Sequence, residues 1–348
     1  MSTRRTITIA GGGLAGLTLG IALRQRGVPV TLWEAGSYPR HRVCGEFISG
    51  RGQDGLQRHG LLNRIVANGA VEARTTAFFD GPSHAVRHDL ARPALCISRH
   101  ALDEQLAEEF REAGGELRIG QRWKESFTGA GVVRATGRKP CAKVGGWRWF
   151  GLKVHVRGMQ LSADLEMHVC KRGYVGLCRV KQPDVVNVCG LFRSREAIPD
   201  LGEQWLDWLR GPQNETLATR WEGATIDPES FCSVAGLSME RDAGPRLSEL
   251  SVGDAWTMIP PVTGNGMSMS FESADLAVEP IVDYSTGRLS WAEARDETVR
   301  RCDRAFRTRL RWAGWLQRAL FNPAGRRALR FVTAHVPGAW NVWFENTR

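Results

Sequence analysis

The residues best placed to hold a charged ligand form a glycine-rich turn near the start of the chain. A β-rich run at residues 6–10 leads into the G-x-G-x-x-G pattern of Gly11, Gly13 and Gly16, and an apolar helical stretch follows. Gly11 permits a tight turn, Gly13 lets a phosphate approach the backbone, and Gly16 lets helix and strand pack closely. Ala15 lies in the first helical turn, whose free N–H groups and positive dipole attract anions. The pattern predicts a pyrophosphate site that includes Ala15.

An acidic residue follows this turn at the distance that a nucleotide ribose requires. Gly27 ends the helix, residues 28–33 form a second strand, and Glu34 closes it. A carboxylate about 20 residues after the turn accepts hydrogen bonds from a ribose diol. These elements together predict a dinucleotide-binding unit, and by themselves they fit NAD and FAD equally.

Later stretches of the chain decide between the two cofactors. The loop 38–47 (Tyr-Pro-Arg-His-Arg-Val-Cys-Gly-Glu-Phe) stands where a dehydrogenase would continue into its next crossover helix. The other deciding stretches come later in the chain. They are a helix from about 99 to 113, a buried strand at 132–138, Gly253-Asp254 after a short strand, and a glycine-containing turn at 260–267 before a helix to 279.

Together these stretches resemble the flavoprotein superfamily of para-hydroxybenzoate hydroxylase, and within it most closely the geranylgeranyl reductase family. The resemblance covers nearly the whole chain and implies FAD as the cofactor. It implies that Glu34 binds the adenosine ribose and that Arg99 lies near the cofactor phosphates. Arg42 is grouped with these cofactor-binding residues.

The same resemblance places the flavin end of the cofactor. It implies that Asp254, which follows Gly253, accepts a ribityl hydroxyl. Gly264 and Gly266 would then begin a helix whose N-terminus faces the flavin pyrimidine ring. A helix N-terminus there stabilises the negative charge of a reduced flavin.

The loop 39–47 matches the proline-containing Cys-Gly loop of the reductases and supplies two candidate catalytic residues, Cys44 and Glu46. By this resemblance Cys44 lies beside the isoalloxazine, where it donates a proton or tunes the potential. The alternative is a small buried thiol that fills space. Glu46 orients a substrate or Arg42, or else is a solvated loop carboxylate.

Two departures from the superfamily pattern bear on the reaction. The segment 135–137 (Ala-Thr-Gly) replaces the Asp-Gly segment of many hydroxylases, which argues against a hydroxylase. The segment 147–149 (Trp-Arg-Trp) is similar to part of a flavin halogenase signature, but Gly-Leu at 151–152 replaces the Ile-Pro that completes it. The leading hypothesis is therefore NAD(P)H-driven reduction of a carbon–carbon double bond in an isoprenoid or other lipophilic substrate. Alternatives, in order, are FAD-dependent monooxygenation of an aromatic or polyketide substrate, halogenation, and flavin binding without turnover.

Four β-rich runs between the flavin segments predict one antiparallel sheet, at 147–157, 165–170, 174–180 and 185–192. Its histidines, His155 and His168, are expected to be structural rather than acid catalysts. The predicted fold class is α/β: a Rossmann-like FAD domain of the glutathione reductase and para-hydroxybenzoate hydroxylase type, an inserted antiparallel-sheet substrate domain, and C-terminal helices. The expected boundaries are 1–145 and 235–285 for the FAD domain, 146–234 for the substrate domain and 286–348 for the helical tail.

Composition and charge set the remaining expectations. The 348 residues carry a net charge of +10, but arginine spread along the chain supplies the excess, which disfavours nucleic acid as a partner. Arginines between 300 and 318 alternate with apolar residues in an amphipathic helix, expected to pack on the protein or to contact an anionic membrane. Eight scattered cysteines without a C-x-x-C pair indicate reduced thiols and no zinc site. We expect a cytoplasmic protein, with peripheral membrane contact as an open alternative, that binds a lipophilic or aromatic small molecule.

Overall fold

The glycine turn follows the central strand of a five-stranded sheet. The computed structural model describes residues 4–81, 85–181, 184–196, 198, 201–211, 214–238, 248–336 and 338–347. The five-stranded sheet has the order β13-β7-β1-β2-β6, and every neighbouring pair of strands is parallel. Its strands are β1 (Ile7–Ala10), β2 (Val30–Glu34), β6 (Glu116–Ile119), β7 (Val132–Arg134) and β13 (Leu250–Ser251). The strand predicted at 132–138 is therefore shorter than expected.

Three helices hold this sheet in place: α1 (Leu14–Gln25), α4 (Arg99–Glu112) and α7 (Gly266–Ser285). Helix α1 contacts both α4 and α7, and its residues 14–23 are all buried. A helix covered on every side is apolar all round, as this one is. The predicted helices beginning at Arg99 and Gly266 are confirmed, and the second continues past residue 279 to Ser285.

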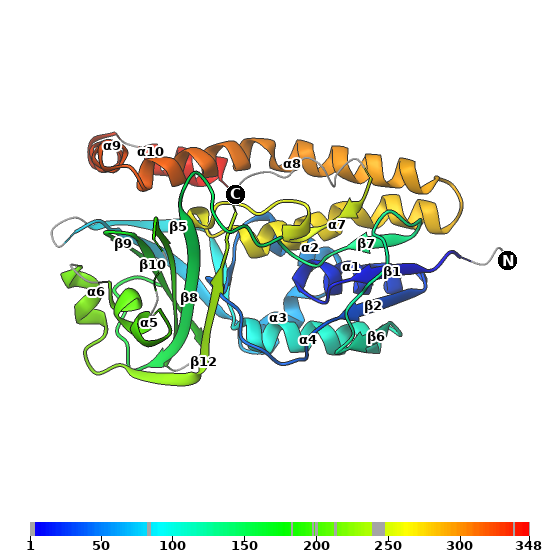
Figure 1. Cartoon of the computed structure of the whole chain (residues 1–348), viewed down its shortest axis with the longest axis horizontal. Helices are drawn as coiled ribbons and strands as arrows, with labels where there is room; N and C mark the ends of the chain where they lie inside the picture. Colours follow the sequence, from blue (N-terminus) through cyan, green and yellow to red (C-terminus); the bar gives the residue numbers. More distant parts are fainter. Residues whose placement is uncertain are drawn as a thin grey trace.

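A second, larger sheet stands beside the first (Figure 1) and has the order β12-β8-β11-β10-β9-β4-β5-β3. Its strands are β3 (Phe47–Ile48), β4 (Val71–Phe79), β5 (Ala85–Cys96), β8 (Arg148–Arg157), β9 (Leu165–Cys170), β10 (Gly173–Lys181), β11 (Val185–Ser194) and β12 (Thr225–Ala235). The four predicted runs are β8 to β11, and their pairings are antiparallel as expected.

The large sheet reaches beyond the residues from which it was predicted. Strands β3, β4 and β5 lie within 1–145, the range expected for the FAD domain, yet they join this sheet through a parallel pair between β4 and β9. Local alternation shows that a strand exists but not which distant strand it pairs with, so the sequence pattern missed this connection. The sheet is consequently mixed rather than wholly antiparallel.

One face of the large sheet is closed by short helices. Helices α5 (Leu201–Arg210) and α6 (Glu215–Arg220) lie between β11 and β12 in the chain. Trp208 of α5 packs edge-on against Phe150 and Phe192, which point from β8 and β11 into this layer. The opposite face, with Tyr174 and Leu191, packs against Leu320 and Phe321.

The C-terminal helices cross both sheets. Helix α8 (Trp291–Leu320) begins with a capping box between Ser290 and Glu293, runs along α7 and continues past it toward the large sheet (Figure 1). A buried ion pair between Arg309 and Glu272 fixes α8 on α7, with distances of 2.7 and 2.6 Å. Helices α9 (Pro323–His335) and α10 (Ala339–Asn346) follow, while α2 (Arg51–Arg58) and α3 (Leu62–Ala67) connect β3 to β4. No helix among the described residues is long and apolar enough to cross a bilayer.

Candidate functional site: a cofactor cradle and an apolar chamber

The three glycines of the turn face different surroundings. A Cβ atom on Gly11, which has φ +112°, would lie 2.3 Å from the carbonyl oxygen of Ala135. One on Gly16 would lie 2.0 Å from the carbonyl oxygen of Gly11, whereas one on Gly13 would meet nothing within 4 Å. Gly11 and Gly16 are thus required by packing. Gly13 borders open space at the N-terminus of α1, where its backbone can approach a phosphate.

Glu34 lies at the end of β2, directly beside this turn. Its Oε2 accepts a hydrogen bond from the N–H of Gly12 at 2.8 Å, and its Oε1 accepts from Gly36 at 2.7 Å. Arg40 forms an ion pair with the same carboxylate. Burial opposes ionisation of Glu34, but the Gly36 N–H and Arg40 outweigh it and lower the pKa. An ionised carboxylate with a remaining lone pair at the cavity wall can accept a ribose hydroxyl.

Two arginines share one buried carboxylate on the next side of the cavity. Arg99 donates from Nε and Nη2 to Asp103 at 2.7 and 2.8 Å, and Arg42 approaches the same group at 3.2 Å. Ser98 caps the helix that carries Arg99 and Asp103. Because one carboxylate balances only one of the two guanidinium groups, one positive charge is left for an anionic ligand.

The chain returns to the cavity at two turns near its C-terminal third. Gly253 has φ +62°, and a Cβ atom there would lie 2.8 Å from that of Ala15. The next residue, Asp254, has no hydrogen-bond partner among the described residues, and burial raises its pKa against the opposing charges of Arg99 and Arg138. Its carboxyl group borders the cavity and is available to a hydroxyl of a ligand.

The N-terminus of α7 provides the last element of the cradle. Gly264 is left-handed, with φ +62°, and a Cβ atom there would enter the ring of Phe47 at 2.0 Å. A Cβ atom on Gly266 would meet nothing within 4 Å. The first N–H groups of α7 therefore border the cavity without a side-chain cap, and they offer partial positive charge to a ligand.

These elements enclose a single cavity of about 1190 Å³. One part is lined by the glycine turn, Glu34, Asp254 and the start of α7. The other is an apolar chamber under the large sheet and the C-terminal helices, lined by Phe78, Met167, Tyr174, Leu191, Leu320 and Phe344, among others. The cavity is larger than the usual range of about 300–1,000 Å³ for one small ligand, so it can hold a cofactor and a substrate together.

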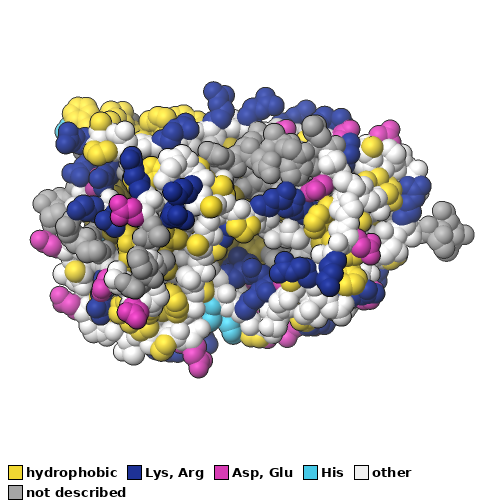
Figure 2. Space-filling model, viewed as in Figure 1, with side chains coloured by type: hydrophobic (Ala, Val, Ile, Leu, Met, Phe, Trp, Pro, Cys, Tyr) yellow, Lys and Arg dark blue, Asp and Glu magenta, His cyan; other side chains and the backbone are white. Residues whose placement is uncertain are grey.

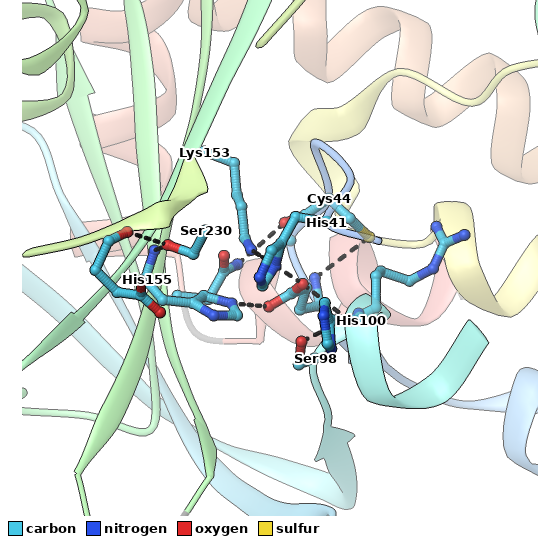
Figure 3. A network of polar contacts seen from close by, with 12 residues as sticks. His41, Cys44, Ser98, His100, Lys153, His155 and Ser230 are labelled. Carbon is cyan, nitrogen blue, oxygen red and sulfur yellow. Dashed lines mark hydrogen bonds and ion pairs between the residues drawn. The ribbon is translucent and has the colours of Figure 1, made fainter. Parts of the chain in front are cut away.

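The loop that carries Cys44 and Glu46 is pinned to the large sheet (Figure 3). Glu46 is fully buried with φ +57°, so the expectation of a solvated loop carboxylate is wrong. Its Oε2 lies 2.6 Å from Nε2 of His155, and its Oε1 accepts from the Arg99 N–H at 2.9 Å and lies 3.5 Å from Nζ of Lys153. Glu46 therefore pairs with β8 rather than with Arg42, whose partner is Asp103.

This buried group extends to the protein surface. Lys153 Nζ lies 3.0 Å from Nδ1 of His41, whose ring packs against His100 at 4.6 Å between centroids. Burial and the charge of Lys153 lower the pKa of His41 to about 4. Burial also opposes ionisation of Glu46, but the hydrogen bond from His155 and the charge of Lys153 lower its pKa. We call Glu46, Lys153, His155 and His41 the buried charge group; within it, Glu46 and Lys153 are oppositely charged and wholly enclosed.

The sequence pattern predicted His155 as a structural residue but missed Lys153 and His41. Lys153 stands in an otherwise apolar run of β8 and is fully buried. A lysine is almost never buried without a partner, so its place in such a run was the available signal. The pattern could not show that the partner would be Glu46, because the two residues lie on different elements.

Cys44 lies on the cavity wall between these groups. Its Sγ accepts a hydrogen bond from the Glu46 N–H at 3.4 Å, and its carbonyl oxygen accepts from the side chain of Asn187 at 3.0 Å. Burial raises the pKa of the Cys44 thiol, which the nearby charge of Arg99 offsets only in part. The group is thus a protonated thiol at neutral pH, and its predicted role as a proton donor stays a prediction.

A second buried carboxylate belongs to the large sheet itself. Glu166 of β9 is held by His168 at 2.8 Å, by Arg220 at 2.9 Å and by the hydroxyl of Ser162 at 2.8 Å. Burial opposes its ionisation, but these hydrogen bonds prevail and lower its pKa to about 2. His168 accordingly has a structural partner.

The tryptophans of the halogenase-like segment serve packing. Arg193 lies over the rings of Trp147 and Trp149, at 4.0 and 5.6 Å from their centroids. Trp149 also packs edge-on against Phe321 at the end of α8. These contacts join β8, β11 and the C-terminal helices and account for both aromatic residues.

The cradle fits FAD by its donor set: an open glycine turn for the pyrophosphate, an acid for the ribose, a partnerless Asp254 for the ribityl chain and a helix N-terminus for the flavin ring. The large sheet and chamber supply room for a substrate beside it. Fold and site together define a FAD-dependent oxidoreductase.

Comparisons with known proteins agree with that class. Residues 4–140 match the family pattern of the FAD binding domain. Monooxygenase 1 of Arabidopsis thaliana is 29% identical over 116 residues, which are 33% of this chain and 29% of that protein. Conditioned medium factor receptor 1 of Dictyostelium discoideum is 24% identical over 124 residues, 32% of this chain and 24% of that protein. The chain thus matches less than a third of the length of these curated relatives.

Solved structures share the fold over nearly the whole chain. The flavin-dependent brominase Bmp2 superposes with a TM-score of 0.76 at 15% identity, covering 99% of this chain and 93% of that one. The p-nitrophenol 4-monooxygenase PnpA of Pseudomonas putida gives 0.74 at 16% identity, covering 98% and 96%. The predicted fold class is confirmed by these likenesses, which at such identities concern the fold alone.

Proposed function

We propose that the protein is a FAD-dependent monooxygenase that hydroxylates a lipophilic aromatic compound, with NAD(P)H as the electron donor. In the balanced reaction, the substrate, O₂, NAD(P)H and a proton give the hydroxylated product, water and NAD(P)⁺. The substrate C–H bond gives way to a C–OH bond, and the second oxygen atom leaves as water. Bound FAD supplies the two-electron chemistry and the activation of oxygen.

One observation carries this proposal: a single cavity continues from the cofactor cradle into the apolar chamber. The chamber adjoins the flavin end of the cradle, because Thr347, which lines the cavity after α10, accepts a hydrogen bond from the side chain of Asn265 at the start of α7. The chamber's aromatic and aliphatic lining favours an apolar ring or chain. The monooxygenase names among the relatives support hydroxylation over the double-bond reduction that the loop motif predicted.

The residues of this chain bind and orient the reactants. The glycine turn and the excess charge of Arg42 and Arg99 hold the anionic pyrophosphate. Asp254 and the N-terminus of α7 fix the flavin end. The apolar chamber excludes water from the reacting atoms, which protects reactive species from side reactions.

The test is turnover of the FAD-loaded protein under ¹⁸O₂ with NADPH or NADH and a panel of alkylated phenols, nitrophenols and prenylated compounds. We expect NAD(P)H oxidation that substrate accelerates, with one ¹⁸O atom in the product. A mass gain of two under anaerobic conditions would instead identify a reductase. Product formation only when bromide or chloride is present would identify a halogenase, and either result would refute hydroxylation.

A further inference from the structure

Exposed apolar side chains gather on the C-terminal helices. Five large apolar side chains are exposed in the described part of the chain, and only Val66 lies elsewhere, on α3. The other four are Trp315 on α8, Phe331 on α9, Val336 just after α9 and Val342 on α10. Phe331 is 63% exposed. Figure 2 shows hydrophobic side chains together over α9 and α10. We call the four exposed residues Trp315, Phe331, Val336 and Val342 the apolar patch.

Arginines surround the apolar patch with almost no acidic residues between them. Residues 304–347 contain eight arginines and one acid, Glu345. Within the described residues, ion pairs engage only two of the eight, Arg309 with Glu272 and Arg330 with Asp80. The remaining six are Arg304, Arg307, Arg311, Arg318, Arg326 and Arg327. Figure 2 shows Lys and Arg side chains beside the patch and along α8.

The arrangement on α8 combines both features on one face. Arg311 and Arg318 are exposed and stand four residues before and three residues after Trp315, so the three side chains share one side of the helix. The ring of Trp315 also contacts Trp343 of α10, at 6.1 Å between centroids. An exposed tryptophan between two guanidinium groups suits the boundary between lipid headgroups and acyl chains.

The same helices close the substrate chamber from the inside. Leu320 of α8, Leu329 of α9 and Phe344 of α10 all line the cavity. Arg330 lines it too, although its side chain is 45% exposed, and the next residue is Phe331 of the patch. The chamber therefore meets the surface beside the apolar patch.

We propose that the apolar patch and its arginines dock the protein on an anionic lipid bilayer, and that the chamber receives its lipophilic substrate from that bilayer. The apolar side chains enter the headgroup region while the arginines bind lipid phosphates. A second copy of the chain is a poorer occupant, because a twofold contact would set arginines against arginines. Nucleic acid is also a poorer partner, because its charged backbone would not bury four exposed apolar side chains. The substrate class rests on the proposed function, whereas docking requires no turnover.

The experiment is co-sedimentation of the FAD-loaded protein with vesicles, without substrate. We expect binding to vesicles of mixed phosphatidylcholine and phosphatidylglycerol, little binding to phosphatidylcholine alone, and release as salt is raised. Trp315→Ser with Phe331→Ser should weaken binding at least tenfold. Arg311→Gln and Arg318→Gln should each weaken it about fivefold, the usual contribution of one arginine near a charged surface.

Matched controls lie on α3 and α4, on the opposite side of Figure 1 from the patch. Val66→Ser removes an equally exposed apolar residue, and Arg111→Gln removes an exposed arginine. Both should bind vesicles like the wild type, and all variants should retain FAD. Binding that is absent, equal on neutral vesicles, or equally weakened by the controls would overturn the proposal. Tighter binding to duplex DNA, or a dimer that buries the patch, would do the same.

Discussion

The two sheets of this molecule build their parts of the cavity by different means. Around the parallel sheet the cradle is mostly backbone: a glycine turn, two helix N-termini and a left-handed glycine at 264. On the large sheet, buried charged side chains pair with partners from neighbouring segments, as Lys153 does with Glu46 and Glu166 with Arg220. A site built from backbone N–H groups leaves room for a ligand, whereas a buried pair of charged side chains is fully packed and leaves none.

The two halves should therefore respond differently to substitution. A change at Gly13 or Gly266 of the cradle can remove cofactor binding without unfolding the chain, because a side chain there enters open space and disturbs no packing. A change in a buried charge pair acts on folding, because the partner left behind is an uncompensated charge in a low-dielectric interior. Four substitutions test this contrast.

The largest effect is expected at Lys153. Lys153→Met removes the cation between Glu46 and His41, so we expect the free energy of unfolding to fall by about 3 kcal/mol, the lower end for breaking a buried pair. Urea unfolding measures it. Arg148→Met, at the exposed start of the same strand, should cost less than about 0.5 kcal/mol. Adding Glu46→Gln to Lys153→Met should restore part of the loss; a further loss would show that Glu46 is not the partner that matters.

At Gly13 the expected effect falls on the cofactor alone. Gly13→Val places a side chain in open space where the pyrophosphate approaches, so FAD affinity should drop at least about 100-fold, or about 2.7 kcal/mol. The midpoint of urea unfolding of the cofactor-free protein should stay near that of the wild type. Flavin absorbance after purification gives the first measurement. Gly202→Val on α5 also enters open space, but outside the cavity, and should retain FAD.

Much of the parallel half could be predicted because its signals are local. The turn, the acid of β2 and the helices from Arg99 and Gly266 each follow from spacing within a short segment. The large sheet was predicted only as far as its consecutive strands β8 to β11. The joining of β4 to β9 depends on residues about ninety positions apart, and no local pattern encodes such a pairing.

The site divides in the same way. Ten of the eleven positions expected for the cofactor line one cavity, and the exception is Gly16, which packs against Gly11. Most of them belong to turns or helix starts with their own local sequence pattern. The buried charge group was not predicted, since Glu46, Lys153 and His41 carry no shared spacing. The loop motif left Glu46 either as a residue that orients a substrate or Arg42 or as a solvated carboxylate, and only the folded contact with β8 shows that its carboxylate is buried beside His155.

A smaller effect, on pH dependence, is expected at Glu166. The folded protein keeps this carboxylate ionised down to a pKa of about 2, against 4.5 for an ordinary Glu. As pH falls, the unfolded chain takes up the proton first, so stability is present above about pH 5 and is lost toward pH 2. By pH 3 the loss amounts to about 2 kcal/mol. Glu166→Gln should flatten this part of the stability profile, whereas Glu72→Gln, exposed on β4, should leave its slope unchanged.

The smallest effect is expected at Cys44, which touches both halves. If its thiol were the proton donor predicted from the loop motif, Cys44→Ser would slow turnover by about 10²-fold while leaving flavin reduction intact. Burial raises the pKa of this thiol, however, and the charge of Arg99 and the hydrogen bond from the Glu46 N–H offset this only in part, so the thiol is a weak acid and a poor donor. We therefore expect a change in turnover per bound flavin of less than about threefold, with a stability loss of about 1 kcal/mol as for other small core substitutions. Rapid mixing of reduced enzyme with substrate and oxygen measures the first quantity and urea unfolding the second. A hundredfold slowing at unchanged FAD content would restore Cys44 to the reaction, and it would show that the sheet half contributes chemistry as well as shape.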